Sequence, residues 1–332
     1  METLAARPCR AGRRAGAAVL VVLFLACAAG TGWSQPYPSQ DIHFISGFPP
    51  GSGADVMVRY FAEKIRPLAG QPILVENKPG ATGNIAIEYT TRAKPDGYTI
   101  LVHAGSGIAA SQALLKHPPF DAAKQLKVAA TINRQAFMLT VSAQSPYKTV
   151  AELTAAMKAK GSKASYGSNS TQSRIAGSLY NKAENIGAVE VQYKNSQDVI
   201  REMQSGALDF SFQDPQMASA QAQQGRLRLL AICSGTRMQM APDLPTMAEQ
   251  GYPQFNLIGW FAATVPAATP QPIVDKINQW FATVLATPDA NKFLTGFGSD
   301  TWISTPDEAQ AFFLQEIDTW QKNVTESGIE RQ

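Results

Sequence analysis

The sequence predicts an α/β protein with two domains, in each of which helices cover a mostly parallel sheet. Short apolar runs typical of buried strands are followed by turns rich in Gly, Pro, Ser and Asn, and then by apolar residues at helical spacing. This alternation restarts near Phe137, without the short repeat period of a solenoid. The roughly 300 residues after the N-terminal segment suit one large or two medium domains.

The first strand–turn–helix unit begins with the apolar residues 42–45 and continues through a Pro- and Gly-rich turn at residues 47–53. Asp55 follows at the start of an apolar-periodic segment, and we interpret it as a helix cap. Such a unit places backbone N–H groups and a helix N-terminus around a ligand. The turn lacks the Lys-Ser/Thr ending of a P-loop and the spacing of a dinucleotide fingerprint. Phosphate is therefore not the obvious ligand, and a carboxylate would fit the same geometry.

The remaining elements follow in order. In the first half we expect a strand at 72–76, a turn at 77–84, a helix at 85–92, a strand at 98–103, a helical pattern to residue 115 and a strand at 126–132. In the second half we expect strands at 137–141, 164–166, 189–191, 207–212 and 227–232 and helices at 150–159, 172–183 and 195–204. A strand at 260–265 then precedes helices at 273–285, 289–294 and 306–327. Ligands of open α/β sheets bind beyond the carboxyl ends of strands. The strand-to-helix turns at 47–55, 103–107, 167–174 and 213–217 could therefore face one another across a cleft between the domains.

Residues 1–34 predict a secretory signal peptide. Four Arg residues precede an apolar run at residues 15–29, which is shorter than the ~20 residues of a membrane span, and small residues follow. The full chain has 29 Lys+Arg and 26 Asp+Glu, and this segment holds four of the Arg and one Glu. The predicted mature protein is therefore formally neutral, which argues against nucleic acid or an anionic membrane as a partner.

Few residues suggest catalysis or metal binding. His43, His103 and His117 are isolated and lack metal-ligand spacing. Ser106 lies between two Gly residues but outside the Gly-x-Ser-x-Gly pattern, so we expect no catalytic residues, no metal and no cofactor. Cys233, the only cysteine beyond the predicted leader, lies in the apolar run 227–233 and is interpreted as a small buried hydrophobe.

Several motifs, in the same order along the chain, resemble the tripartite tricarboxylate transporter substrate-binding proteins, also called Bug receptors. The specific ones are Val75-Glu76-Asn77-Lys78-Pro79-Gly80-Ala81 and Pro95-Asp96-Gly97-Tyr98-Thr99. The others are Tyr37-Pro38, Phe48-Pro49-Pro50-Gly51, Asp55, Ser145-Pro146-Tyr147-Lys148-Thr149, Tyr193-Lys194, Leu244-Pro245-Thr246-Met247-Ala248-Glu249-Gln250-Gly251, Trp260-Phe261 and Pro266-Ala267-Ala268-Thr269-Pro270.

This resemblance implies a type II periplasmic-binding-protein fold with a ligand cleft between its two α/β domains. We expect one domain from residues 37–131 plus 256–332 and the other from 132–255, with hinges near Arg134 and Asn256. By match to the family, the ligand-binding residues would be Phe48, Pro49, Gly51, Ser52, Gly53, His103, Gly105, Ser106, Ser168, Ser170, Thr171 and Asp214.

The chain departs from the family pattern in the third turn, where the family usually has Gly-Ser-x-x-His-Leu. If Thr171 caps the following helix, Arg174 falls in its first turn, where a cation opposes the helix dipole. Ile175 and Leu179 should face the core, which leaves Arg174 at the edge of the cleft. We interpret Arg174 as a specificity residue that pairs with a ligand carboxylate, and the alternative is a solvated side chain.

The implied function is that of a periplasmic solute-binding protein. It would capture a small carboxylate or aromatic acid and pass it to the membrane permease subunits of a tripartite transporter, as a monomer without enzymatic activity. Two alternatives stay open: an exported serine hydrolase that uses Ser106 and His103, and a ligand-binding adaptor for a signalling system.

Overall fold

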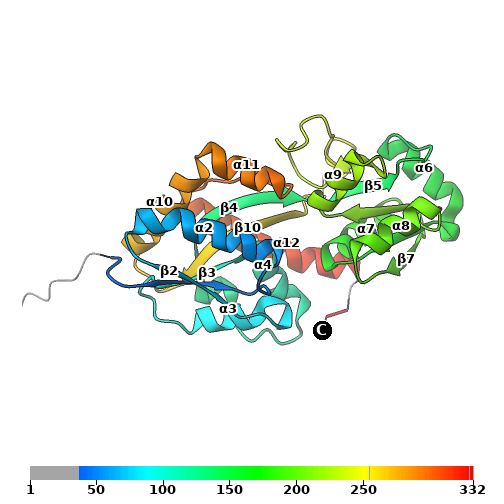
Figure 1. Cartoon of the computed structure of the whole chain (residues 1–332). Helices are drawn as coiled ribbons and strands as arrows, with labels where there is room; N and C mark the ends of the chain where they lie inside the picture. The colour runs from blue at the N-terminus through cyan, green and yellow to red at the C-terminus, as the bar shows by residue number, and fades with distance from the viewer. Residues whose placement is uncertain (1–36, 254, 329, 332) are drawn as a thin grey trace, which may run out of the picture. The chain divides into compact units, whose positions relative to one another are not determined.

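The computed structural model of the chain describes residues 37–253, 255–328 and 330–331, so the predicted signal peptide lies outside the described residues. The described residues form two sheets with helices packed on them (Figure 1), which confirms the predicted α/β class. No helix in the described part of the chain combines the length and the apolar character needed to cross a membrane.

The first sheet has six strands in the order β11-β4-β10-β3-β1-β2. Its strands are β1 (Ile42–Ser46), β2 (Ile73–Asn77), β3 (Thr99–Ala104), β4 (Leu126–Ala136), β10 (Ile258–Pro266) and β11 (Asp300–Thr301). Strand β1 is parallel to β2 and β3, whereas β10 is antiparallel to β3 and β4. The helices of this part are α2 (Gly53–Ala69), η1 (Ala81–Gly83), α3 (Asn84–Thr91), α4 (Gly105–Leu114), α5 (Ala122–Gln125), α10 (Gln271–Leu285), α11 (Pro288–Gly296) and α12 (Pro306–Ser327).

The second sheet has five strands in the order β7-β6-β8-β5-β9. Its strands are β5 (Met138–Ser142), β6 (Ser165–Ser168), β7 (Val189–Gln192), β8 (Phe210–Gln213) and β9 (Leu227–Ile232). Its helices are α6 (Val150–Lys160), η2 (Gly161–Lys163), α7 (Thr171–Ala183), α8 (Ser196–Ser205) and α9 (Pro215–Gln223). Strand β6 is parallel to β7 and β8, and β5 is antiparallel to β8 and β9. Both sheets are therefore mixed, and the prediction of mostly parallel sheets is wrong.

Strand β4 is longer than the sequence predicts. We expect a strand at 126–132, but β4 continues to Ala136 because residues 133–136 pair with residues 258–261 of β10. The next strand, β5, starts two residues later, at Met138, and belongs to the second sheet. Residues 132–137 therefore lead the chain directly from one sheet to the other.

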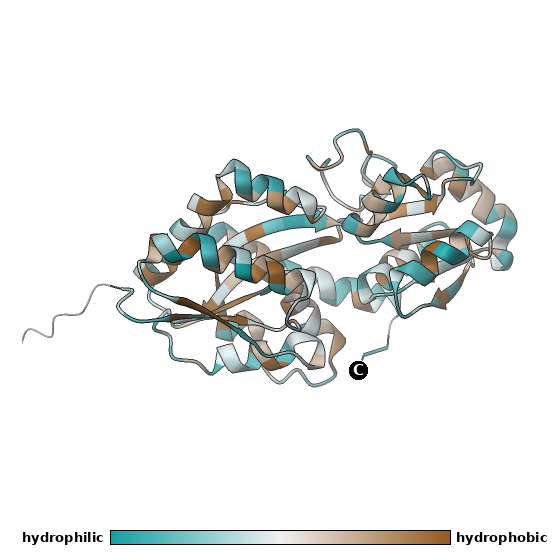
Figure 2. Cartoon of the chain, in the orientation of Figure 1, coloured by the Kyte–Doolittle hydropathy of each residue, from teal (hydrophilic) through white to brown (hydrophobic). Residues whose placement is uncertain are grey.

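Aromatic side chains fill the space between the first sheet and its helices. Phe281 of α10 stacks on Phe44 of β1, with ring centroids 6.0 Å apart, and lies 5.7 Å from Phe61 of α2. All three side chains are fully buried. Hydrophobic residues follow the strands of this sheet, whereas hydrophilic and hydrophobic residues alternate on the helices (Figure 2), which is the pattern of helices with one buried face.

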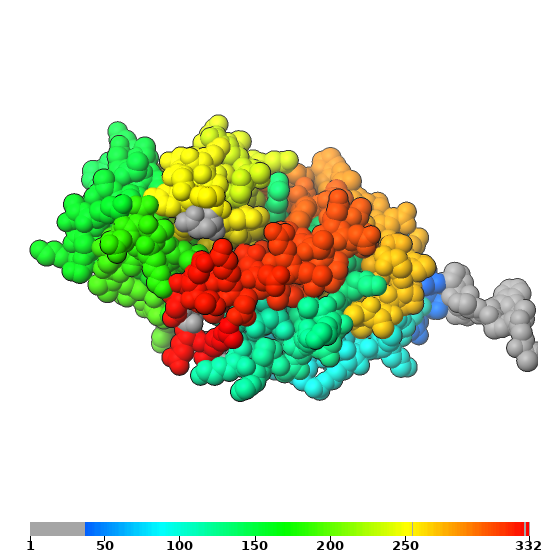
Figure 3. All heavy atoms as spheres, turned by 180° about the vertical axis from the view of Figure 1, so that it is seen from behind, coloured from blue at the N-terminus to red at the C-terminus, as the bar shows by residue number. Residues whose placement is uncertain are grey.

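Helix α12 connects the two groups of elements. It begins with a capping box, in which Thr305 and Glu308 satisfy each other's backbone N–H groups, and Pro306 occupies its first turn. It packs on α4 and β4, and its C-terminal end reaches α7 (Figure 3). There the Ser178 hydroxyl and the Lys182 ammonium group donate hydrogen bonds to the carbonyls of Ser327 and Glu326, at 3.0 and 2.7 Å.

Candidate functional site

The turn between β1 and α2 is organised by the carboxylate of Asp55. This carboxylate accepts hydrogen bonds from the Gly51 N–H (2.8 Å), from Asn77 Nδ2 (2.7 Å) and from Arg59 Nε (2.9 Å). Burial alone would raise the pKa of Asp55, but these hydrogen bonds hold it below its ordinary value. The interpretation of Asp55 as a helix cap is wrong: Ser52 is the N-cap of α2, and its hydroxyl accepts from the Asp55 N–H at 3.3 Å. Asp55 instead sets the shape of the turn.

His103, at the end of β3, is packed inside the protein. Its ring stacks on Phe48, with centroids 4.4 Å apart, and burial lowers its pKa to about 4, so the ring is neutral at pH 7. Its Nε2 atom lies against two glycines: a Cβ would stand 2.5 Å from it at Gly47 and 2.3 Å at Gly83. The ring therefore wedges between the β1–α2 turn and the turn before α3, and glycine at both positions makes room for it.

The neighbouring residues Gly105 and Ser106 begin α4, and both are buried. In the described part of the chain, His103 Nε2 has no hydrogen-bond partner, so it does not activate Ser106. A serine hydrolase needs that hydrogen bond between nucleophile and base. The geometry gives the hydrolase alternative no support.

The third turn is capped by Ser170 rather than by Thr171, which corrects the expected cap. Ser170 and Ser173 form a reciprocal capping box, and Thr171 is the first residue of α7. Arg174 falls in the first turn as expected, and Ile175 and Leu179 are buried.

Arg174 is neither fully solvated nor unpaired. Its Nε donates to Glu190 Oε1 at 3.1 Å, and the Ser168 hydroxyl donates to the same oxygen at 2.6 Å. The Arg174 side chain is 32% exposed and that of Glu190 24%, so the pair is partly shielded from solvent. Glu190 neutralises the cation that the helix dipole opposes.

The fourth predicted position, Asp214, is the N-cap of α9. Its carboxylate accepts the Met217 N–H at 2.9 Å, and burial raises its pKa. A capping role explains this side chain without a ligand.

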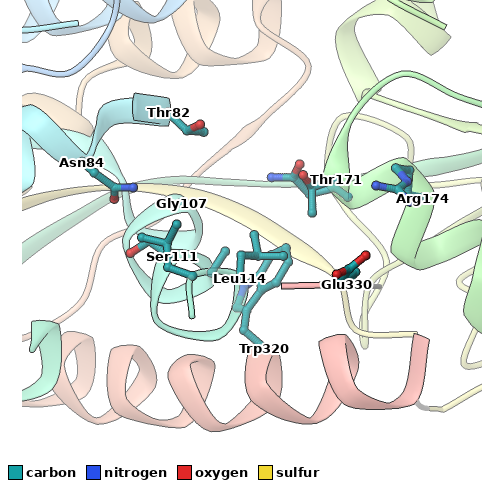
Figure 4. A pocket seen from close by; sticks show the side chains of 12 residues that line it. Thr82, Asn84, Gly107, Ser111, Leu114, Thr171, Arg174, Trp320 and Glu330 are labelled. Carbon is teal, nitrogen blue, oxygen red and sulfur yellow. The ribbon is translucent and has the colours of Figure 1, made fainter. Parts of the chain in front are cut away.

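One pocket of about 140 Å³ lies between the helices of the two sheets. Its lining residues are Thr82, Asn84, Gly107, Ala110, Ser111, Leu114, Leu115, Thr171, Gln172, Arg174, Trp320 and Glu330. Figure 4 shows Thr82, Asn84 and Ser111 on one side, Thr171 and Arg174 on the other, and Trp320 and Glu330 below them. The volume is small beside the ~300–1,000 Å³ of pockets that hold drug-sized ligands, so a small molecule would suit it.

The pocket includes only part of the predicted site. Among the predicted residues, Thr171 and Arg174 line it. The other predicted residues do not line it: Phe48, Pro49, Gly51, Ser52, Gly53, His103, Gly105, Ser106, Ser168, Ser170 and Asp214. The sequence analysis does not predict Thr82 and Asn84 as site residues. The turn at 77–84 is nevertheless a strand-to-helix turn, like the four turns that it predicts to face a cleft.

The first turns of three helices line this pocket. Asn84 is the first residue of α3, Gly107 lies in the first turn of α4, and Thr171 begins α7. Helix N-termini carry free N–H groups and partial positive charge, which favour an anion. The turn before α3 is also strained, because Ala81 and Thr82 have φ values of 45° and 56°.

Asn84 adds an unsatisfied polar group to the pocket wall. Its side chain is only 8% exposed, and its Oδ1 has no hydrogen-bond partner within the described residues. This oxygen can accept only from a donor such as a ligand hydroxyl, whereas a carboxylate would accept from the NH₂ group of the same amide. The described residues contain no group of three or more His, Cys, Asp or Glu side chains able to hold a metal ion.

Comparisons with known proteins agree with this architecture. Residues 57–329 match the family model described as the tripartite tricarboxylate transporter family receptor. Protein BugT of Bordetella pertussis is 28% identical over 298 residues, which cover 89% of this chain and 91% of that protein.

Two solved structures are also similar to this one. The periplasmic binding protein BugD is 26% identical with a TM-score of 0.69, and the match covers 89% of this chain and 100% of that one. Rpa4515 of R. palustris, solved with adipate, is 25% identical with a TM-score of 0.72, over 89% of this chain and 99% of that one.

Proposed function

The chain belongs to the tripartite tricarboxylate transporter family of receptors, and from this membership we propose that it binds a small carboxylate in the pocket between α3, α4, α7 and α12. It then presents this ligand to the membrane permease subunits of a tripartite transporter. The binding of adipate by Rpa4515 supports the chemical class of the ligand.

The observation that carries the proposal is the meeting of three helix first turns at one pocket. Thr82, Asn84 and Ser111 come from the part of the chain around the first sheet, and Thr171 and Gln172 come from the second. A carboxylate there could accept hydrogen bonds from hydroxyl, amide and backbone N–H groups. A ligand held from both sides would also favour the close approach of the two groups of elements, as in hinged binding proteins.

The proposal includes export to the periplasm, removal of the leader and action as a monomer. The leader pattern of residues 1–34 and the neutral charge of the remainder support export and a freely diffusing receptor. Binding without turnover is the expected activity, since the His103 ring is directed at glycines rather than at Ser106.

Native mass spectrometry of freshly purified protein tests the proposal, because it detects a small acid that co-purifies. The matched variant is Asn84→Asp, which places a carboxylate in the pocket wall at a helix N-terminus, where the fold tolerates a negative charge. We expect this variant to lose at least roughly ten-fold in affinity for the identified acid by calorimetry. The control is Asn291→Asp on the exposed surface of α11, which should bind like wild type. Equal affinity of Asn84→Asp and wild type would place the ligand elsewhere.

A further inference from the structure

We propose that the ligand is a monocarboxylate with an apolar body, and that the Arg174–Glu190 pair selects against a second carboxylate. This inference rests on the proposed function and narrows the class of acid. Two observations carry it: the charge balance of the pocket on the α7 side, and the apolar surface provided by α4 and α12.

Among the described residues that line the pocket, the one cationic side chain is already paired with a carboxylate. Arg174 and Glu330 are the charged residues among those that line the pocket. Arg174 is bound to Glu190 at 3.1 Å, and Glu190 also accepts from Ser168 at 2.6 Å. Glu330 is acidic itself, and Lys116 lies 3.9 Å from its carboxylate.

A dicarboxylate that spans the pocket would therefore meet Glu330 in the lining and an Arg174 side chain that is already paired with Glu190 behind it. Glu190 already neutralises the charge of Arg174 through its Nε group, so a second carboxylate would gain less from this guanidinium than from a free cation. The turn before α3 and the first turn of α4 lack such acidic neighbours among the lining residues, so the single carboxylate belongs there.

The floor of the pocket suits an apolar group. Ala110, Leu114 and Leu115 come from the end of α4, and Trp320 comes from α12. Leu114 and Leu115 are half-buried, so an apolar body there would cover surface that now faces the cavity, whereas Trp320 is already buried. The burial of such a surface favours binding in proportion to its area.

Two matched pairs of sodium salts test the selection: hexanoate against adipate, and benzoate against terephthalate. Hexanoate and adipate share a six-carbon chain, and terephthalate is benzoate with one further carboxylate on the ring, so each pair differs by one carboxylate. By calorimetry with the full-length mature protein, we expect hexanoate and benzoate to bind at least ten-fold more tightly than their partners. In Glu190→Gln, Arg174 is released and adipate should gain at least ten-fold, while hexanoate changes less than three-fold.

The control for this variant is Glu184→Gln, which removes a partly exposed, ion-paired carboxylate at the end of α7 that does not line the pocket. It should leave both affinities unchanged. If Glu190→Gln fails to fold, a second variant, Leu114→Ala, tests whether the apolar wall of the pocket binds the ligand. It should weaken hexanoate and benzoate at least three-fold, and the exposed Leu314→Ala of α12 should not.

Tighter binding of adipate or terephthalate by wild type overturns this inference and leaves the proposed function standing. Binding of none of the four salts also overturns the inference. If native mass spectrometry then shows no acid bound either, the proposed function fails with it.

Discussion

The indole of Trp260 lies directly against Gly105, so that a Cβ on this glycine would stand 2.5 Å from ring atoms Cη2 and Cζ2. Both residues are buried. Trp260 also meets Trp302 and Phe312 edge to face, at 5.8 and 5.3 Å between centroids, so the ring has little room to move. The first residue of α4 is therefore glycine for reasons of packing, and through α4 this contact positions the pocket wall.

Gly105→Ala should accordingly destabilise the protein. Overpacking of a tight site costs about 1–3 kcal/mol in the free energy of unfolding, which urea denaturation measures. The control is Gly296→Ala in α11, where a Cβ meets no atom within 4 Å and alanine is the better helix former. If both variants unfold at the same urea concentration, the Trp260 contact does not constrain position 105.

Glu316 of α12 should make stability depend on pH. Burial raises its pKa to about 7, against the opposing effect of the Trp260 and Trp320 indoles that face it. The unfolded chain releases this proton near pH ~4.3, so between that pH and 7 the folded protein binds more protons than the unfolded one. This contribution to stability is therefore largest at low pH and is lost as the pH rises to 7.

Glu316→Gln removes that titration. We measure the free energy of unfolding of the variant minus that of wild type at each pH. We expect this difference to be about 2 kcal/mol more favourable to the variant at pH 8 than at pH 5. Glu326→Gln, on the exposed side of the same helix, should follow wild type at both pH values. Parallel pH profiles of Glu316→Gln and wild type would mean that Glu316 keeps an ordinary pKa.

Cys233 should be unreactive in the native protein. It directly follows β9, it is fully buried as the sequence predicts, and burial raises the pKa of its thiol. The thiolate is the reactive form, so both effects slow its modification. A chromogenic disulfide reagent should label it only in denaturant, and labelling within minutes in native buffer would contradict its burial.

Asp300 should hold the segment after β9 in place. Its two carboxylate oxygens accept the N–H groups of Gln239 and Met240, at 2.8 and 3.0 Å, from β11 of the first sheet. If residues 132–255 form a separate domain, as we predict, these hydrogen bonds cross the domain boundary. Asp300→Ala should destabilise the protein by about 2 kcal/mol and speed hydrogen exchange at 239 and 240. The exposed Asp318→Ala should do neither, and unchanged exchange in Asp300→Ala would show that the segment is held by other contacts.

The order of strands and helices could be predicted from the sequence because it depends on local information. Apolar runs of strand length, turns rich in Gly and Pro, and the helical spacing of apolar residues, as in α10, can each be recognised within a short segment. The motif at 75–81 likewise indicated the family before any contact was known.

The tertiary structure alone decided which residues meet. The Arg174 and Glu190 side chains are 16 residues apart, and Trp320 reaches the pocket from the last helix. Periodicity indicates which face of a helix is buried, but not the partner it is buried against. For this reason the close approach of two glycines to His103 and the pocket between α3, α4, α7 and α12 became visible only in the folded chain. Each depends on the packing of elements distant in sequence, whose geometry no short segment contains.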